Sequence, residues 1–319
     1  MATLSSSGPP AVANTTSARP LSPSERDEAI QLASTRMVHG SFVTFRNAFS
    51  FLETADVVRA GGACRIFNRW HTSHISSISF SLAKVTDEYL AMMGNGGALT
   101  SLASVSFMRC VSMSVAGVSA FSAGYPSLTS VNFELCSTDL PSALTVLAHC
   151  PALKTLGLRY NDAVDGSAAD MRAFAAACGG LHTLSLRGSR MMRHLNAHGL
   201  FSRGTFASLT SLDLGVMPNV TSDTLSAISA ACPALTHVNL ERCRFECLLR
   251  QSLLSSRGSL FATLVNGMGG RLLHLNVAGC ALGGVIESDV LFALARCPNL
   301  ERIDLSAYLG AIGAAEGAA

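Results

Sequence analysis

The sequence is poor in charge and in lysine, and it contains no long, uninterrupted apolar run. Charged residues make up 14% of its 319 residues, and Lys84 and Lys154 are its only lysines. Residues 110–133 form the longest stretch without charge, but serine, threonine, glycine and proline interrupt it, which disfavours a membrane span. The formal net charge of +2 gives no electrostatic argument for nucleic acid. We therefore expect neither a membrane nor a nucleic acid as a partner.

The first residues lack the apolar core of a secretory signal peptide. Residues 1–23 are rich in serine, threonine, alanine and proline, and Arg19 is their only charged residue. This composition predicts a disordered tail, with an organelle transit peptide as the alternative. Without a secretory signal, we expect a cytoplasmic or nuclear protein whose ten cysteines are free thiols.

The short motifs that carry common enzyme chemistry are also missing. We find no G-x-S-x-G, no Walker lysine and no H-E-x-x-H. His194 and His198 have the spacing of two metal ligands on a helix, but the sequence offers no evident third ligand. We therefore expect no enzyme activity, no cofactor and no metal site.

The chain does contain a sequence motif of the form L-x-x-L-x-L, called the phrase here, which recurs at intervals of about 27 residues. Its nine copies begin at Ile75, Leu102, Leu128, Leu153, Leu181, Leu209, Leu235, Leu272 and Leu300. The fourth and sixth places are apolar in every copy, as in Val105 and Phe107. Alternation with a period of two predicts a short strand with one buried face. One longer interval, of about 37 residues, predicts an insertion within residues 244–271 that falls in a loop.

After each strand the apolar period becomes helical. In "VTSDTLSAISAAC", Leu225, Ile228 and Cys232 lie on one helical face, and Thr221 or Ser222 is the expected N-cap. A single strand–turn–helix unit cannot bury its apolar face, whereas stacked units can. The sequence therefore predicts an α/β solenoid bent into a horseshoe, with a parallel sheet inside and helices outside.

Cysteine recurs at fixed places of this repeat. Four cysteines occupy the ninth place of the phrase, and four others end the helices; these are Cys110, Cys136, Cys243 and Cys280, then Cys150, Cys178, Cys232 and Cys297. The pattern resembles the cysteine-containing subclass of leucine-rich repeats. We expect the solenoid to cover residues 73–310 in about nine repeats, followed by a flexible C-terminus at 311–319. Because the cysteines occupy equivalent rungs, structural packing is favoured over metal binding.

Residues 24–72 precede the repeats and show three helical apolar patterns instead. Within them, "NAFSFLETADVVRAGGACRIFNRW" resembles an F-box, although the usual Leu-Pro opening is missing and Gly61 and Gly62 replace a helix former. The resemblance implies a trihelical module that docks on the Skp-type adaptor of a cullin-based (SCF-type) ubiquitin ligase. The residues that it implies for this contact are Leu52, Val57, Val58, Phe67 and Trp70.

Two functions follow from this arrangement. The chain is either the substrate-recognition adaptor of the ligase, or a non-catalytic leucine-rich-repeat scaffold whose first helices only cap the solenoid. In both cases a protein would bind the concave face, where the third, fifth and seventh places of each phrase point. The residues that we expect to contact it are Arg159, Arg187, Asp213, His237, Asn239, Glu241, His274, Asn276, Arg302 and Asp304.

Between Asp170 and Asp213 the sequence has several arginines, including Arg172 and Arg187, and no acidic residue. This stretch favours an ordinary solvated face, with a basic patch for an acidic or phosphorylated substrate as the alternative.

Overall fold

The computed structural model describes residues 75–306, except 82–84, 97–98, 137–138, 162–167, 190–199, 203, 218–219, 244–263 and 281–293. All of the described residues belong to the second of the two units into which the chain divides, His71–Ala319. The tail expected at 1–23, the helical module expected at 24–72 and the C-terminus at 311–319 lie outside the described residues, as does most of the predicted insertion.

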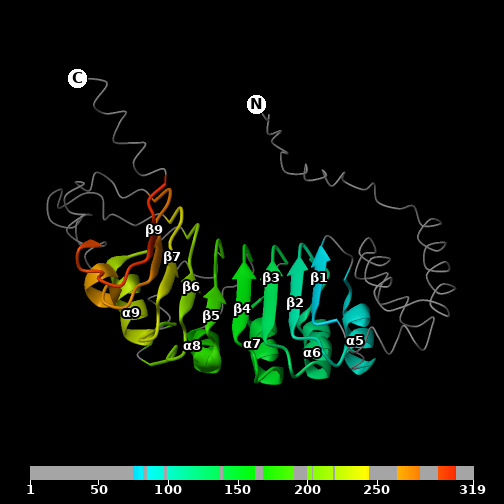
Figure 1. Cartoon of the computed structure of the whole chain (residues 1–319). Helices are drawn as coiled ribbons and strands as arrows, with labels where there is room; N and C mark the ends of the chain where they lie inside the picture. The colour runs from blue at the N-terminus through cyan, green and yellow to red at the C-terminus, as the bar shows by residue number, and fades with distance from the viewer. Residues whose placement is uncertain are drawn as a thin grey trace, which may run out of the picture. The chain divides into compact units, whose positions relative to one another are not determined.

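The described residues form a nine-stranded parallel sheet whose strands follow chain order (Figure 1). Its strands are β1 Ser77–Ser81, β2 Ser104–Met108, β3 Ser130–Glu134, β4 Thr155–Arg159, β5 Thr183–Ser185, β6 Ser211–Asp213, β7 His237–Asn239, β8 His274–Asn276 and β9 Arg302–Asp304. Each strand begins at the third place of one predicted phrase, which confirms the repeat and its register.

Equivalent places of neighbouring repeats lie side by side in this sheet. Val105 of β2 pairs with Val131 of β3, which in turn pairs with Leu156 of β4. All three are buried, whereas the residues that alternate with them along β2 and β3 are only half-buried. The period of two in the sequence therefore marks a sheet with one face against the core.

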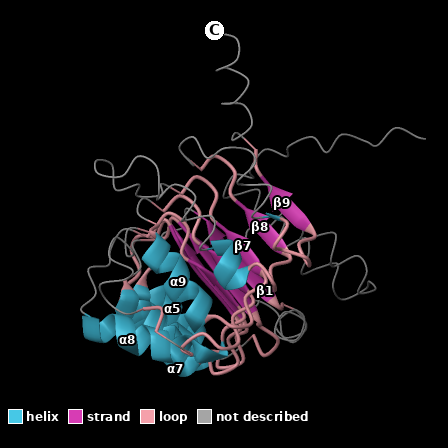
Figure 2. Ribbon diagram, turned by 90° about the vertical axis from the view of Figure 1, so that its left-hand side faces the viewer, coloured by secondary structure: helices cyan, strands magenta, loops and turns pink. Residues whose placement is uncertain are grey.

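Helices cover that buried face, and the other face, called the open face here, stays uncovered (Figure 2). The described helices are α5 Asp87–Gly96, α6 Val115–Gly124, α7 Leu140–His149, α8 Ala168–Ala177 and α9 Ser222–Ala231, and the 3-10 turn η1 Cys178–Gly180 follows α8. Side chains cap several of them: Asp139 accepts from Ser142 N–H at the start of α7, and Thr221 accepts from Thr224 N–H at the start of α9. Of the two caps expected for α9, the structure therefore uses Thr221. The arrangement is the leucine-rich-repeat solenoid that the sequence predicted.

A row of stacked aromatic rings fills the core under the first strands. Phe107 lies between Phe80 and Phe133, with ring centroids 5.3 Å and 5.4 Å apart and nearly parallel planes. All three side chains are buried, and each contributes about 1.5–3 kcal/mol through burial of its apolar surface. From β4 onward the same place holds leucine, beginning with Leu158, except for Val277 after β8.

The ninth place of each phrase forms a second row inside the solenoid. The thiol of Cys136 donates to the carbonyl of Phe107 at 3.2 Å, and that of Cys243 donates to the carbonyl of Leu214 at 3.0 Å. Both carbonyls belong to the preceding repeat, so each of these hydrogen bonds links two consecutive repeats. All eight described cysteines are buried free thiols, as predicted, and burial raises the pKa of Cys243 to about 12.

Asn161 occupies this ninth place in the fourth repeat. Its side chain is fully buried, accepts from Cys136 N–H at 2.9 Å and donates to the Phe133 carbonyl at 3.0 Å. The amide thus accepts from a backbone N–H and donates to a backbone carbonyl at the same time.

Candidate functional site

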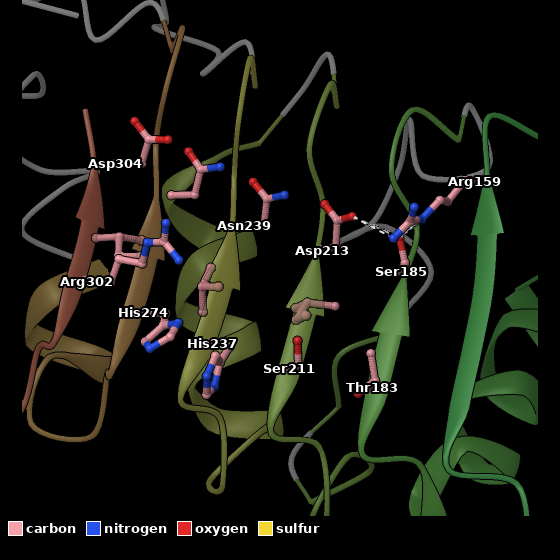
Figure 3. Close-up of a pocket in the computed structure, with 14 residues that line it drawn as sticks. Arg159, Thr183, Ser185, Ser211, Asp213, His237, Asn239, His274, Arg302 and Asp304 are labelled. Carbon is pink, nitrogen blue, oxygen red and sulfur yellow. Dashed lines mark hydrogen bonds and ion pairs between the residues drawn. The ribbon is translucent and has the colours of Figure 1, made fainter. Parts of the chain in front are cut away.

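The open face of β4 to β9 carries a shallow cavity of about 450 Å³, called the trough here (Figure 3). Its lining residues are Arg159, Thr183, Ser185, Ser211, Leu212, Asp213, His237, Val238, Asn239, His274, Leu275, Asn276, Arg302 and Asp304. Eight of the ten side chains predicted to contact a ligand are among them. Arg187 and Glu241 are outside the lining, at the seventh place of their phrases, and bond to each other.

The fifth places of the last four repeats form one row along the trough. Asp213, Asn239, Asn276 and Asp304 are successive partners in the strand register. Each accepts through Oδ1 from the backbone N–H two residues onward, at 3.0, 2.9, 2.9 and 2.9 Å respectively. These are Asx turns, which satisfy backbone groups where the chain leaves the strand. These four side chains therefore have a structural role that was not predicted. The sequence signal for this role is an Asp or Asn at the end of each of the last four strands.

Asp213 is the centre of a charged network at the β4 end of the trough. Arg159 Nε donates to Ser185 Oγ at 3.0 Å, and Ser185 Oγ donates to Asp213 Oδ2 at 3.0 Å (Figure 3). The guanidinium of Arg159 also lies 3.9 Å from the same oxygen, and that of Arg187 lies 3.9 Å from Oδ1. Both carboxylate oxygens are thus engaged, which leaves Asp213 little capacity for a ligand.

Arg187 spans two repeats to reach its main partner. Its Nη2 donates to Glu241 Oε2 at 3.0 Å, and its Nε donates to Tyr160 Oη at 3.1 Å. Between Arg187 and Glu241 the equivalent residue is Gly215, where a Cβ would lie only 2.4 Å from Arg187 Nη1. The bridge therefore depends on glycine at that place. Burial opposes the positive charge, but the hydrogen bonds to Tyr160 and Glu241 outweigh it and raise the pKa of Arg187.

The third places of the last three repeats bring cationic and imidazole side chains together. His237 pairs with His274, and His274 pairs with Arg302, on adjacent strands. The two imidazole centroids lie 4.3 Å apart. His237 Nδ1 lies 2.8 Å from Thr236 Oγ1, and His274 Nε2 lies 3.6 Å from Glu301 Oε2. The carboxylates nearest to this row are Glu301 and Asp304.

The predicted basic patch does not assemble from its described members. Arg172 is exposed on α8, on the helical side of the sheet, whereas Arg187 belongs to the open face. Arg187 is moreover neutralised by Glu241 and Asp213. Arg172 and Arg187 therefore do not share a surface, because they follow different elements of one repeat and those elements form different layers; the other basic residues of the stretch, Arg190, Arg193 and Arg203, lie outside the described residues.

The five residues implied for ligase contact, Leu52, Val57, Val58, Phe67 and Trp70, lie outside the described residues. Among the residues that are described, no three His, Cys, Asp or Glu side chains are grouped as metal ligands. In the same part of the chain, no helix combines the length and the apolar character needed to span a bilayer.

The fold is a leucine-rich-repeat solenoid, and its open face carries a polar trough. Comparisons with known proteins do not assign the chain to a narrower family. No protein-family model matches the chain. A Tonsoku-like protein of Mus musculus is 27% identical over 187 residues, which cover 57% of this chain but only 13% of that relative. The chain thus spans a small part of the curated relative that it matches.

Solved structures with a similar architecture are more distant in sequence. The TLR13–ssRNA13 complex aligns with 72% of this chain and 29% of its own, at 18% identity and a TM-score of 0.46. The leucine-rich-repeat protein LegL7 of Legionella pneumophila aligns with 75% of this chain and 85% of its own, at 15% identity and a TM-score of 0.44. Likeness at this level does not bear on what this chain binds.

Proposed function

We propose that this chain is a non-catalytic protein-binding subunit that presents a substrate to a cullin-based ubiquitin ligase. The observation that carries the proposal is the trough, where six successive strands offer side chains to one continuous, open surface. Such a surface fits an extended protein segment better than a small molecule, because small-molecule sites enclose most of their ligand. The ligase part of the proposal is supported by the F-box-like residues 49–70.

In this function the chain would hold the substrate protein in position and would not itself catalyse the transfer of ubiquitin. A protein held on the open face would have its lysines kept close to the ubiquitin-charged enzyme of the complex. Tethering raises the effective concentration of the two reactants and converts their encounter into an intramolecular event. The side chains of the trough would then decide which protein is held, whereas the helices of the first unit would decide which ligase receives it.

The test asks whether the chain associates with a cullin-based ligase and whether this association depends on the F-box-like residues. Tagged full-length chain is purified from cells, and its partners are identified by mass spectrometry. We expect cullin-complex subunits to be recovered, and Val58→Asp to lower their recovery at least about tenfold, because a buried charge at an interface costs several kcal/mol. The matched control is Val111→Asp, since Val111 is 66% exposed on the solenoid.

Two outcomes would contradict the proposal. A well-expressed bait that recovers no cullin-complex subunit would favour the alternative, a scaffold whose first helices only cap the solenoid. Equal recovery by the wild type and by Val58→Asp would show that any ligase contact is made elsewhere on the chain.

A further inference from the structure

We propose that the outer edge of β9 is a self-association surface, to which a second copy of this chain adds its own β9 in the antiparallel direction. Such self-association is separate from the proposed function, because it concerns how two chains meet and not which protein they hold. Three features of β9 support it: backbone groups that face away from the sheet, apolar side chains that are only half-buried, and a pattern of opposite charges.

The backbone of β9 uses only one of its two sides in the described sheet. β9 is the last strand in the sheet order and pairs with β8, and Figure 2 shows it beyond β8 at the margin of the sheet. Arg302 N–H donates to the Leu273 carbonyl at 3.0 Å. The Asp304 carbonyl accepts from Val277 N–H, also at 3.0 Å. Since alternate residues of a parallel strand bond to the same neighbour, the N–H and C=O groups of Ile303 point away from β8, where another strand can pair with them.

The apolar side chains at this edge are less covered than their equivalents in other repeats. Ile303, at the fourth place of its phrase, is half-buried, whereas Leu275 of β8 is only 2% exposed at the same place. Ile78 is also 2% exposed, although β1 is the other outermost strand of the sheet. Leu305, at the sixth place, is half-buried too, whereas Val277 of the preceding repeat is fully buried. A second chain on this edge would remove apolar surface from water, which favours association.

The charges of β9 decide which partner fits and in which register. Arg302 and Asp304 flank Ile303 on the open face, and neither forms an ion pair within the described part of the chain. Two β9 strands that pair antiparallel about Ile303 place Arg302 of each copy opposite Asp304 of the other, whereas a pair centred on either charged residue would place like charges opposite each other. Glu301 lies 3.6 Å from His274 of β8, and so lies on the side away from this edge. Because β9 complements itself, a second copy of the chain is the favoured partner.

This pairing has a consequence for the trough. Residues that lie opposite each other in an antiparallel pair share one face of the sheet, so the open faces of both copies would lie on the same side. Each trough includes Arg302 and Asp304 in its lining. The two troughs of the dimer would therefore meet at the two-fold axis and form one longer surface.

Sedimentation of the purified full-length chain between about 1 and 100 µM tests the proposal. We expect the weight-average mass to rise with concentration toward twice the mass of one chain. Arg302→Asp places like charges opposite each other and should weaken association at least about tenfold, and Asp304→Arg should do the same. The matched control is Arg242→Asp, because Arg242 is an exposed arginine that follows β7, and this variant should associate as the wild type does.

A mixture of the two charge-reversed chains gives the sharpest test. Arg302→Asp carries two aspartates on β9 and Asp304→Arg carries two arginines, so the mixed pair regains both opposite-charge contacts, which neither variant regains alone. We expect the equimolar mixture to associate about as strongly as the wild type, a result that misfolding of either variant cannot produce.

Three outcomes would contradict the proposal. A wild-type chain that stays monomeric throughout this range would overturn it, as would a dimer that both charge reversals leave unchanged. A mixture that does not recover, with both variants shown to be folded by circular dichroism, would overturn the register centred on Ile303. The assay contains no ligase subunit, so its result and the recovery of cullin subunits are separate.

Discussion

From β1 to β3 the strands carry phenylalanine at the sixth place inside and mostly serine outside, whereas from β6 to β9 the inside places hold leucine, valine or isoleucine and each strand carries at least one charged or amide side chain outside. The backbone register is the same in both halves. The inside is constrained because every side chain must fill the space between sheet and helices at close-packed density. The open face has no such constraint, so its side chains can differ between halves without changing the fold. The comparison therefore shows that packing fixes the residues of one face and leaves those of the other free to vary.

The largest effect is expected inside the first half. Phe107→Ala should lower the free energy of unfolding by about 3–5 kcal/mol, because it removes the ring stacked between Phe80 and Phe133 and leaves a cavity. Denaturant unfolding of the full-length chain measures the change. Phe107→Leu is the matched control, since leucine holds the same place at Leu158 and Leu186, and it should cost less than half as much. Equal losses for the two variants would contradict this expectation and show that the stacked ring contributes more than the volume it fills.

An intermediate effect is expected on the open face of the second half. Gly215→Ala should destabilise the protein by about 1–3 kcal/mol, because its Cβ would displace the Arg187 guanidinium and break its hydrogen bond to Glu241. The measurement is again denaturant unfolding, now as a double-mutant cycle. In an Arg187→Ala background the same glycine change should cost much less. Purely additive losses would contradict the dependence of the bridge on Gly215.

The smallest effect is expected between two helices of the first half. Asp87 of α5 accepts from Ser114 N–H at 2.7 Å and from Ser114 Oγ, and these bonds lower the pKa of Asp87. A lowered pKa stabilises the fold above the carboxyl's unfolded value, and that stability is lost as the pH falls through the folded value. Because Asp87 is largely exposed, Asp87→Asn should cost less than about 1 kcal/mol at pH 7.

Thermal unfolding followed between pH 7 and pH 3 checks this last prediction. The difference between the wild type and Asp87→Asn should shrink as the pH falls below about 4. A difference that stays constant over this range would mean that the carboxylate charge is not what Ser114 binds.

Much of the architecture could be predicted from local pattern. The alternation of apolar residues with a period of two predicted the position of every described strand, because a strand with one buried face shows this alternation. Thr221 was one of two expected caps for α9, and the structure chose between them. The trough was predicted nearly as well, since alternation along a strand also says which residues face outward, and Asp213, His237 and Arg302 follow that rule.

Contacts between repeats could not be predicted in the same way. Asn161 breaks the cysteine pattern at the ninth place, and only its two partners, Cys136 and Phe133, show why an amide belongs there. Arg172 and Arg187 are near each other in the chain, but only the structure shows that one belongs to the helical layer and the other to the open face.

The sequence by itself determined the repeat, the strand register and the identity of the outward side chains, because these depend on periods of two to four residues within one repeat. Only the tertiary structure decided which outward charges neutralise each other. Arg187 and Glu241 are separated by 54 positions in the chain and meet across a glycine of the repeat between them. A charge that is paired in this way has little capacity left for a ligand. That distinction depends on distances between strands, which no local pattern contains.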